Sequence, residues 1–199
     1  MRLFAATSNA GKMREFLLAS DAIPGCEIAP LPRFRELPTV EETGTTFEEN
    51  ARIKAVHYSG FTGELVFAED SGLVVDALAG APGVYSARFA GAGASDAANN
   101  HLLLERLRDV SDRRARFICT IALARQGEVL ATFVGSLEGS ILLEERGENG
   151  FGYDPLFFHA PSGRTTAELT PQEKLSISHR GQAFRALLRW LAGQREMNP

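Results

Sequence analysis

The chain has 199 residues, a net charge of −4 and 44% hydrophobic residues, which is enough for a single domain over residues 1–199 with a substantial core. The acidic balance argues against nucleic acid held by bulk electrostatics, although it does not exclude a small nucleotide ligand. No apolar run is long enough to span a bilayer, so we expect no membrane partner. Cys26 and Cys119 lack metal-ligand spacing, which favours a reduced, cytoplasmic setting.

The N-terminus predicts a strand over residues 2–6, a tight polar loop, and a helix from Met13 onward. The loop consists of Thr7, Ser8, Asn9, Ala10, Gly11 and Lys12. Hydroxyls, an amide, backbone N–H groups and a Lys beside a helix N-terminus suit an anion, typically phosphate. A polar turn with a solvated Lys fits the loop equally well. The P-loop motif does not fit, because it requires Gly where Ala6 stands and Ser or Thr where Met13 stands.

The next third of the chain predicts alternating strands and helices. Thr46 and Glu49 form a capping box for a helix that Gly60 closes. The expected elements are a strand at 27–31, a helix at 47–59, a strand at 65–68 that resumes at 73–75 after the polar residues 69–72, and a Gly- and Ala-rich loop at 80–93.

The rest of the chain adds a hairpin and a second Gly-rich loop. The expected elements are a helix at 96–108, strands at 115–125 and 128–137 joined at Gln126-Gly127, an extension at 139–143 after a bend, a loop at 147–155, one helical turn at 171–175, and a helix that Ser178 caps and that runs to Ala192. Early alternation followed by a hairpin predicts an α/β fold with a mixed sheet.

Two acidic pairs point to a hard divalent cation. Asp70 is expected at the carboxyl end of a buried strand, where ligand crevices of α/β sheets lie, and Glu69 precedes it. Glu41 and Glu42 form the second pair. Mg²⁺ prefers one or two carboxylates together with water and phosphate oxygens. Two solvated acidic turns are the alternative, and Lys54 could reach a phosphate or simply be solvated.

Three late cations are hard to explain by helix stability. If Ser178 is the N-cap, His179 and Arg180 fall in the first helical turn, where positive charge opposes the helix dipole. Together with Lys174 they indicate an anionic or polar ligand. Phe151 to Asp154 places aromatics and a carboxylate on a loop, which suits stacking on a base, although such aromatics also pack into cores.

The sequence contains no G-x-S-x-G nucleophile elbow, no H-E-x-x-H zinc motif and no C-x-x-C motif. The remaining chemistry is metal-assisted attack by water on a phosphoryl group.

Six stretches, in order and covering nearly the whole chain, resemble the inosine triphosphate pyrophosphatase family, the Ham1-like noncanonical purine nucleoside triphosphate pyrophosphatases. They are Thr7 to Lys12, Glu42 to Ala55, Glu69 to Leu73, Gly80 to Arg88, Gly150 to Pro155, and Lys174 with Ser178 to Gly181. Glu69 departs from the family, in which many members carry Asp.

The resemblance implies a two-lobed α/β domain around a long mixed sheet with flanking helices, an active-site cleft between the lobes, and a homodimer. It implies Mg²⁺-dependent hydrolysis of ITP, dITP and XTP to the monophosphate and pyrophosphate.

The resemblance also implies roles for individual residues. Thr7 to Lys12 and Lys54 bind the triphosphate, Asp70 accepts a proton and binds metal, Glu42 (or Glu41) is the second metal carboxylate, and Ser71 contacts substrate. Phe151 stacks on the base within a binding loop that includes Gly152 and Tyr153, while Asp154, Lys174, His179 and Arg180 recognise the base.

Two other interpretations remain open. A Maf-like nucleotide pyrophosphatase shares the reaction type but favours other bases, and the Phe151–Pro155 and Ser178–Gly181 stretches argue against it. A catalytically silent nucleotide-binding protein would not require Asp70, Glu42 and Lys54 together.

Overall fold

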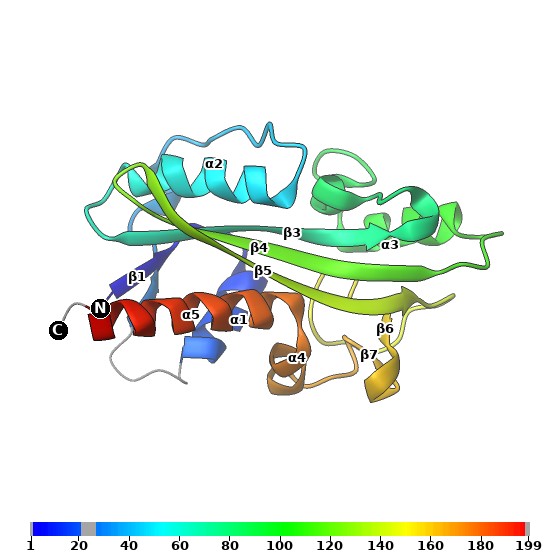
Figure 1. Cartoon of the computed structure of the whole chain (residues 1–199). Helices are drawn as coiled ribbons and strands as arrows, with labels where there is room; N and C mark the ends of the chain where they lie inside the picture. The colour runs from blue at the N-terminus through cyan, green and yellow to red at the C-terminus, as the bar shows by residue number, and fades with distance from the viewer. Residues whose placement is uncertain (1, 21–26, 198–199) are drawn as a thin grey trace. The chain divides into compact units, whose positions relative to one another are not determined.

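The computed structural model describes residues 2–20 and 27–197. It confirms the α/β class, with a seven-stranded mixed sheet in the order β2-β1-β3-β4-β5-β6-β7 and helices beside it (Figure 1). The chain divides into two compact units. The first contains residues 1–70, 119–135 and 179–199, and the second contains residues 71–118 and 136–178. Three long strands, β3, β4 and β5, have residues in both units: β3 (Leu65–Val75), β4 (Arg114–Arg125) and β5 (Glu128–Ile141).

In the first unit, β1, β2 and β3 are parallel, and helices lie on both faces of the sheet. β1 pairs in parallel with β2 on one side and with β3 on the other. Helix α2 lies on one face, and α1 and α5 lie on the opposite face (Figure 1). The remaining bounds are β1 (Arg2–Ala5), α1 (Ala10–Ser20), β2 (Glu27–Pro30), η1 (Phe34–Glu36), α2 (Phe47–Ser59) and α5 (His179–Met197).

An aromatic trio joins α1, β3 and α5 in the core of this unit. The rings of Phe16, Phe67 and Phe184 have centroid separations of 4.9, 5.0 and 5.5 Å. Each of the three side chains is almost completely buried, and burying each stabilises the fold by about 1.5–3 kcal/mol. The trio therefore anchors the N-termini of α1 and α5 near β3.

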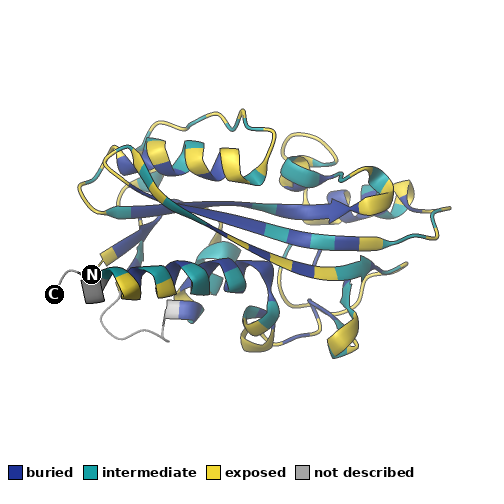
Figure 2. Ribbon diagram, viewed as in Figure 1, coloured by how far each residue is buried: buried dark blue, intermediate teal, exposed yellow. Residues whose placement is uncertain are grey.

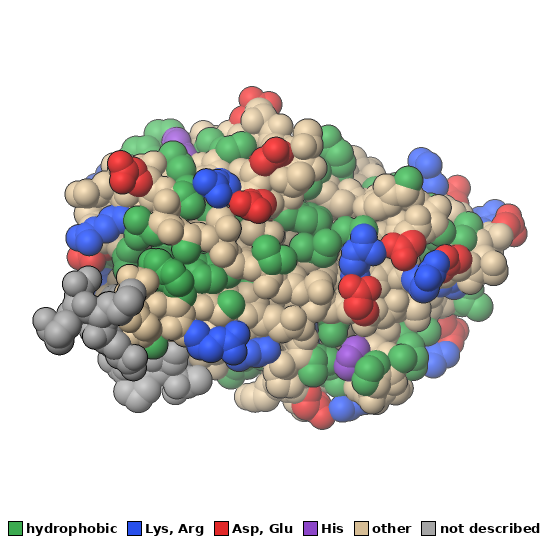
Figure 3. Space-filling model, in the orientation of Figure 1, with side chains coloured by type: hydrophobic (Ala, Val, Ile, Leu, Met, Phe, Trp, Pro, Cys, Tyr) green, Lys and Arg blue, Asp and Glu red, His purple; other side chains and the backbone are tan. Residues whose placement is uncertain are grey.

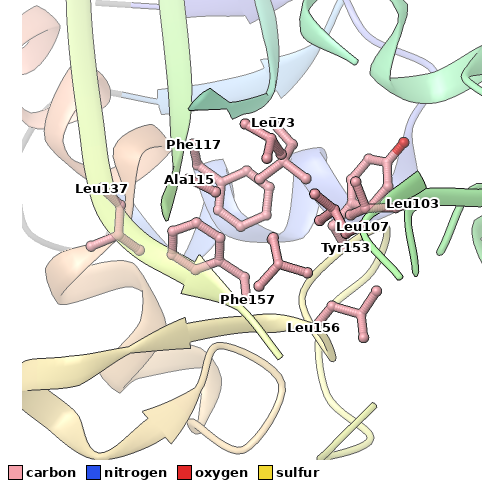
Figure 4. Packing of buried hydrophobic residues seen from close by; sticks show 11 residues of the cluster. Leu73, Leu103, Leu107, Ala115, Phe117, Leu137, Tyr153, Leu156 and Phe157 are labelled. Carbon is pink, nitrogen blue, oxygen red and sulfur yellow. The ribbon is translucent and has the colours of Figure 1, made fainter. Parts of the chain in front are cut away.

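The second unit has its own hydrophobic core, built from the remaining halves of the long strands and from α3. Leu73, Leu103, Phe117 and Phe157 are among its buried members (Figure 4). β6 pairs antiparallel with β5 and with β7. The other elements of this unit are η2 (Asp76–Leu78), η3 (Gly83–Arg88), α3 (Asp96–Arg106), β6 (Phe157–His159), η4 (Ala160–Ser162), β7 (Arg164–Thr165) and α4 (Pro171–Ile177).

The prediction of two strands interrupted at residues 69–72 is wrong. β3 is continuous from Leu65 to Val75, so Asp70 lies inside a strand and not at its end. All eleven residues of β3 except Leu65 and Ser71 are buried, as the dark blue ribbon shows (Figure 2). The strand continues because its acidic side chains have cationic partners and because Gly72 allows the Ser86 side chain to approach closely.

Several predicted boundaries also need correction. α1 begins at Ala10, so Ala10 to Lys12 form its first turn and do not belong to the preceding loop. β5 has no break between 137 and 139 and ends at Ile141. The helical turn at 171–175 is the complete helix α4, and α5 extends five residues beyond Ala192. Cys26 lies outside the described residues, while Cys119 is buried in β4.

The described helices include none with both the length and the hydropathy needed to cross a bilayer. On the face seen in Figure 3, Lys and Arg side chains alternate with Asp and Glu side chains, so charges of opposite sign offset each other there.

Close packing of α5 on β5 predicts a sharp response to substitution at Gly135. A Cβ at Gly135 would overlap the backbone of α5 at His179 and Ala183. We expect Gly135→Ala to lower the free energy of unfolding by about 1–3 kcal/mol, because neither backbone can move freely. Urea denaturation measures the change. Gly63→Ala is the control, since a Cβ there has no heavy atom within 4 Å, and equal losses in the two variants would contradict the prediction.

Candidate functional site

The first part of the candidate site is the N-terminus of α1. Lys12 N donates to Asn9 Oδ1 at 3.0 Å, and Asn9 N donates to Thr7 Oγ1 at 3.2 Å. Asn9 therefore caps the helix, and the first N–H groups of a helix have no acceptor within it. Ser8, Asn9 and Ala10 are exposed. The loop is shorter than predicted, but an exposed helix N-terminus attracts an anion. The geometry is therefore still consistent with phosphate binding.

A buried carboxylate in β3 holds two cations in the first unit. Glu69 forms an ion pair with Lys12, and its Oε2 lies 3.6 Å from Arg180 Nη2. Arg180 Nη1 also binds Glu15 Oε2 at 2.6 Å. Burial alone would raise the pKa of Glu69, but Lys12 and Arg180 outweigh it and hold that pKa well below its usual range. Glu69 is therefore ionised and fixes the N-termini of α1 and α5.

The second carboxylate of β3 belongs to another polar group. Lys54 Nζ lies 3.3 Å from Asp70 Oδ1 and 2.8 Å from Glu42 Oε2. Asn50, one turn before Lys54 on α2, donates to Asp70 Oδ2 at 3.2 Å and accepts from Gly44 N at 2.8 Å. The capping box from Thr46 to Glu49 sets the start of α2 and hence the position of both side chains.

The environment of Asp70 favours proton uptake. Burial raises the pKa of Asp70; Lys54 opposes the shift, and Glu69 supports it, leaving the pKa above its usual value. Burial opposes the charge on Lys54, but Asp70 and Glu42 outweigh it, so the pKa of Lys54 is raised. A carboxylate with a raised pKa beside a permanent cation can accept a proton from water.

The donor set of Glu42 and Asp70 fits Mg²⁺. Both carboxylates bind the ammonium group of Lys54, so two negative charges lie close together at this point. Within residues 2–20 and 27–197, no group of three or more His, Cys, Asp or Glu side chains gathers to hold a metal. Two carboxylates with the remaining positions left to water and phosphate is the coordination that Mg²⁺ prefers. Glu42 is the acid at this point, while Glu41 is exposed.

In the second unit, a second buried ion pair supports an aromatic ring. Lys174 Nζ lies 2.5 Å from Asp154 Oδ2 and 4.9 Å from the centroid of the Phe151 ring. Asp154 Oδ2 also accepts from Phe151 N at 2.8 Å, and its Oδ1 accepts from Thr166 Oγ1 at 2.8 Å. Asp154 therefore fixes both the loop backbone and the cation beneath the ring.

Local sequence places Lys174 in this arrangement. Thr170 and Glu173 form a capping box at the start of α4, which the sequence analysis missed, and Lys174 follows with 5% exposure. Tyr153 points into the hydrophobic core, and its hydroxyl donates to Ser86 O at 2.9 Å. Of the two loop aromatics, Tyr153 is thus the core residue, and Phe151 is the ring beside the cation.

The structure distributes the predicted site residues over both units. In the first unit it brings Lys54, Glu42 and Asp70 together, while Lys12 pairs with Glu69, the neighbour of Asp70 on β3. In the second unit it brings Phe151, Asp154 and Lys174 together. His179 and Arg180 begin α5, in the first unit, and Ser71 follows Asp70 along β3.

Sequence reasoning missed several side chains that organise these groups. Asn50 had a signal, because it stands four residues before Lys54 on a helix. Glu15 had none, since its partner Arg180 is 165 residues away in the sequence. Glu69 was named beside Asp70 as an acid, but its pairing with Lys12 and Arg180 was not predicted.

Comparison with known proteins gives a consistent result. Residues 3–190 match the Ham1 family. The chain is 51% identical to the dITP/XTP pyrophosphatase of Exiguobacterium sibiricum, over 94% of this chain and 95% of the relative. It is 51% identical to the protein of the same description from Geobacter sulfurreducens, over 94% of each chain. Among solved structures, the HAM1 protein of Coxiella burnetii has a TM-score of 0.87 and 44% identity, with 97% of this chain and 99% of that chain covered.

The loop that carries Phe151 should depend on Gly150. Gly150 has a φ of +81°, and a Cβ there would overlap the Asp154 carboxylate. Gly163 has a similar φ of +66°, but a Cβ there has no heavy atom within 4 Å. Both Gly→Ala variants should lose about 1–3 kcal/mol of unfolding free energy from backbone strain, and Gly150→Ala should lose more.

The extra loss is expected because the clash disturbs a buried ion pair. Urea denaturation of the two variants measures it. If Gly150→Ala and Gly163→Ala are equally stable, Asp154 does not depend on the close approach at Gly150.

Proposed function

This chain belongs to the Ham1 family, and we propose that it hydrolyses dITP, ITP and XTP to the corresponding monophosphate and pyrophosphate. The observation that carries the proposal is the buried carboxylate Asp70, held between Lys54 and Asn50. The names of the curated relatives, dITP/XTP pyrophosphatases, support the same activity. Hydrolysis of these nucleotides removes altered purines from the nucleotide pool.

Two lysines and a helix N-terminus suit the triphosphate. Lys12 and Lys54 are only partly exposed, so their charges are less screened than those of surface lysines. The N–H groups at the start of α1 and the polar side chains of Thr7 to Asn9 add neutral donors. These groups would bind the phosphate oxygens and stabilise the negative charge that develops as pyrophosphate leaves.

Mg²⁺ is proposed at Glu42 and Asp70. When bound, it would supply additional positive charge to the phosphate oxygens. Lys54 now lies against both carboxylates, and its position lets it neutralise them or turn toward a phosphate. Glu42 and Asp70 would therefore hold both Mg²⁺ and Lys54 near the phosphate that reacts.

Asp70 is proposed to accept the proton of the attacking water. The water oxygen forms a bond to the α-phosphorus, and the bond from that phosphorus to the bridging oxygen breaks. The water proton passes to Asp70, and the bond electrons leave with pyrophosphate. Asp70 would act as the general base, and the amide of Asn50 orients its other oxygen, Oδ2.

The Phe151 ring and its neighbours are proposed to bind the base. Aromatic rings stack on purines, and Lys174 beside the ring offers a donor to a 6-keto oxygen. His179 and Arg180 are further donors proposed for this recognition. Adenine carries an amino group at that position, which would leave a buried donor without an acceptor, so ATP should be a poor substrate.

We also propose a homodimer, which the family resemblance supports, and a cytoplasmic setting, which two Cys residues without metal-ligand spacing favour. Sedimentation velocity tests the dimer directly, and a single monomeric species at micromolar concentration would contradict it.

A panel of nucleotides tests the activity. We expect pyrophosphate release from ITP, dITP and XTP with kcat/KM at least roughly 100-fold above that for ATP, because the keto oxygen must accept a hydrogen bond. GTP and dTTP complete the panel, and chelation of Mg²⁺ should abolish release. A preference for dTTP would favour the Maf-like alternative, whereas absence of release from ITP and XTP would refute the proposal.

Substitution of Asp70 separates chemistry from binding. Asp70→Asn should lower kcat for ITP by roughly 10²–10⁴-fold, the usual contribution of a general base, while calorimetric ITP binding largely survives. Asp109→Asn, at an exposed position, is the matched control and should keep full activity. Loss of ITP binding in Asp70→Asn would mean that Asp70 chiefly captures metal or substrate.

A further inference from the structure

We propose that Asp96 and Asn100 on α3 are positioning residues that hold Gly152 and thereby fix the Phe151 ring for the base. This inference rests on the proposed function, because it concerns the base-binding loop of the same enzyme. Neither residue was singled out by the sequence, and both belong to the second unit together with the loop.

The two side chains hold opposite ends of a single residue. Gly152 N donates to Asp96 Oδ2 at 2.7 Å, and Asn100 Nδ2 donates to Gly152 O at 3.2 Å. Asp96 and Asn100 are four residues apart on a helix, so their side chains lie on the same face, one turn apart. One face of α3 therefore holds both polar groups of the Gly152 backbone.

Asn100 also reaches the start of the loop. Its Nδ2 donates to Glu145 Oε1 at 2.7 Å, so one amide joins Glu145 and Gly152, which lie seven residues apart. Both partners are acceptors, and only the amide nitrogen can serve them. The orientation of the Asn100 side chain is thus set by its neighbours.

The other atom of this amide shows why the donor matters. Asn100 is 3% exposed, and its Oδ1 has no hydrogen-bond partner among the described residues. An unsatisfied buried acceptor destabilises a fold, and an apolar side chain would avoid it. Asn100 stands here instead and supplies the Nδ2 donor. This indicates that the residue serves the loop and not the packing of the helix core.

The loop needs support from outside because its own backbone is permissive. Gly147, Gly150 and Gly152 all have positive φ, at +85°, +81° and +63°. Glycine loses the most conformational freedom on folding and offers no side chain to pack. Asp154 holds the loop from within through Phe151 N. Asp96 and Asn100 hold the next residue, so the Phe151 ring is fixed from both sides.

Asp96 has a competing local role. It stands in the first turn of α3, after the N-cap Ser95, where an acid interacts favourably with the helix dipole. That role requires a charge but no partner. The contact with Gly152 requires an acceptor but no charge, so Asp96→Asn keeps the contact and loses the charge, whereas Asp96→Ala loses both.

Steady-state kinetics with ITP test the proposal. Asp96→Ala and Asn100→Ala should each raise KM by about 3- to 10-fold, as expected for the loss of one hydrogen bond, with little change in kcat. Asp96→Asn should restore the wild-type KM, and Asp109→Ala, an exposed site beyond the end of α3, is the control. Inhibition by pyrophosphate, a probe of the phosphate-binding groups alone, should be unchanged in every variant.

The kinetic result has clear contrary outcomes. If pyrophosphate inhibition weakens in parallel with KM, the variants disturb the whole enzyme and the proposal fails. If Asp96→Asn behaves like Asp96→Ala, the charge and not the contact is what matters, and the role assigned to Asp96 is wrong. Circular dichroism and thermal unfolding establish that each variant is folded before it is compared.

Amide hydrogen exchange tests the geometry without any activity. The Gly152 N–H should exchange about 3- to 10-fold faster in Asp96→Ala than in the wild type and in Asp96→Asn. If that difference appears but ITP is not hydrolysed by the wild type, the positioning is real and the proposed function is wrong. If ITP is hydrolysed and Gly152 exchanges equally in all variants, the proposed function stands and the positioning role is refuted.

Discussion

Two adjacent acids inside a buried strand are the constraint on which the rest of the candidate site depends. Glu69 and Asp70 lie in the middle of β3 with 5% and 7% exposure. Isolated buried carboxylates are strongly destabilising unless cations and donors surround them. Side chains alternate across a strand, so neighbouring acids face opposite sides of the sheet. Each acid therefore recruits its own partners: Glu69 those of α1 and α5, and Asp70 those of α2.

This constraint explains residues that look misplaced along the chain. Arg180 in the first turn of α5 opposes the helix dipole, but it compensates Glu69 and Glu15. The same principle operates in the second unit, where Lys174 compensates the buried Asp154. The Cys119 thiol donates a hydrogen bond to Glu69 Oε2 at 3.3 Å. Burial is the main cause, and the charge of Glu69 the second, that raises the pKa of this thiol. That thiol stays protonated and acts as a donor.

Local signals predicted the elements well where the cause was local. The capping box at Thr46, the cap at Gly60, the hairpin at Gln126-Gly127 and the buried face of α5 are all present. The break predicted in β3 and the late start predicted for α1 were wrong for a common reason. Polar residues were taken as loop, although distant charges allow Glu69 and Asp70 to continue a strand, and Asn9 caps the helix earlier than the apolar pattern indicated.

By itself, the sequence determined the fold class and the family, because six short stretches in a fixed order carry that information, and it supplied the candidates for the site residues. Asp70, Lys54, Phe151 and Lys174 could all be named in this way. Only the tertiary structure decided that Glu42 and not Glu41 joins Lys54, that Tyr153 is a core residue, and that Asn100 holds Gly152. Each of these depends on side chains that lie far apart in the chain, and a hydrogen bond or an ion pair forms only where the folded backbone brings its two partners within about 3–4 Å.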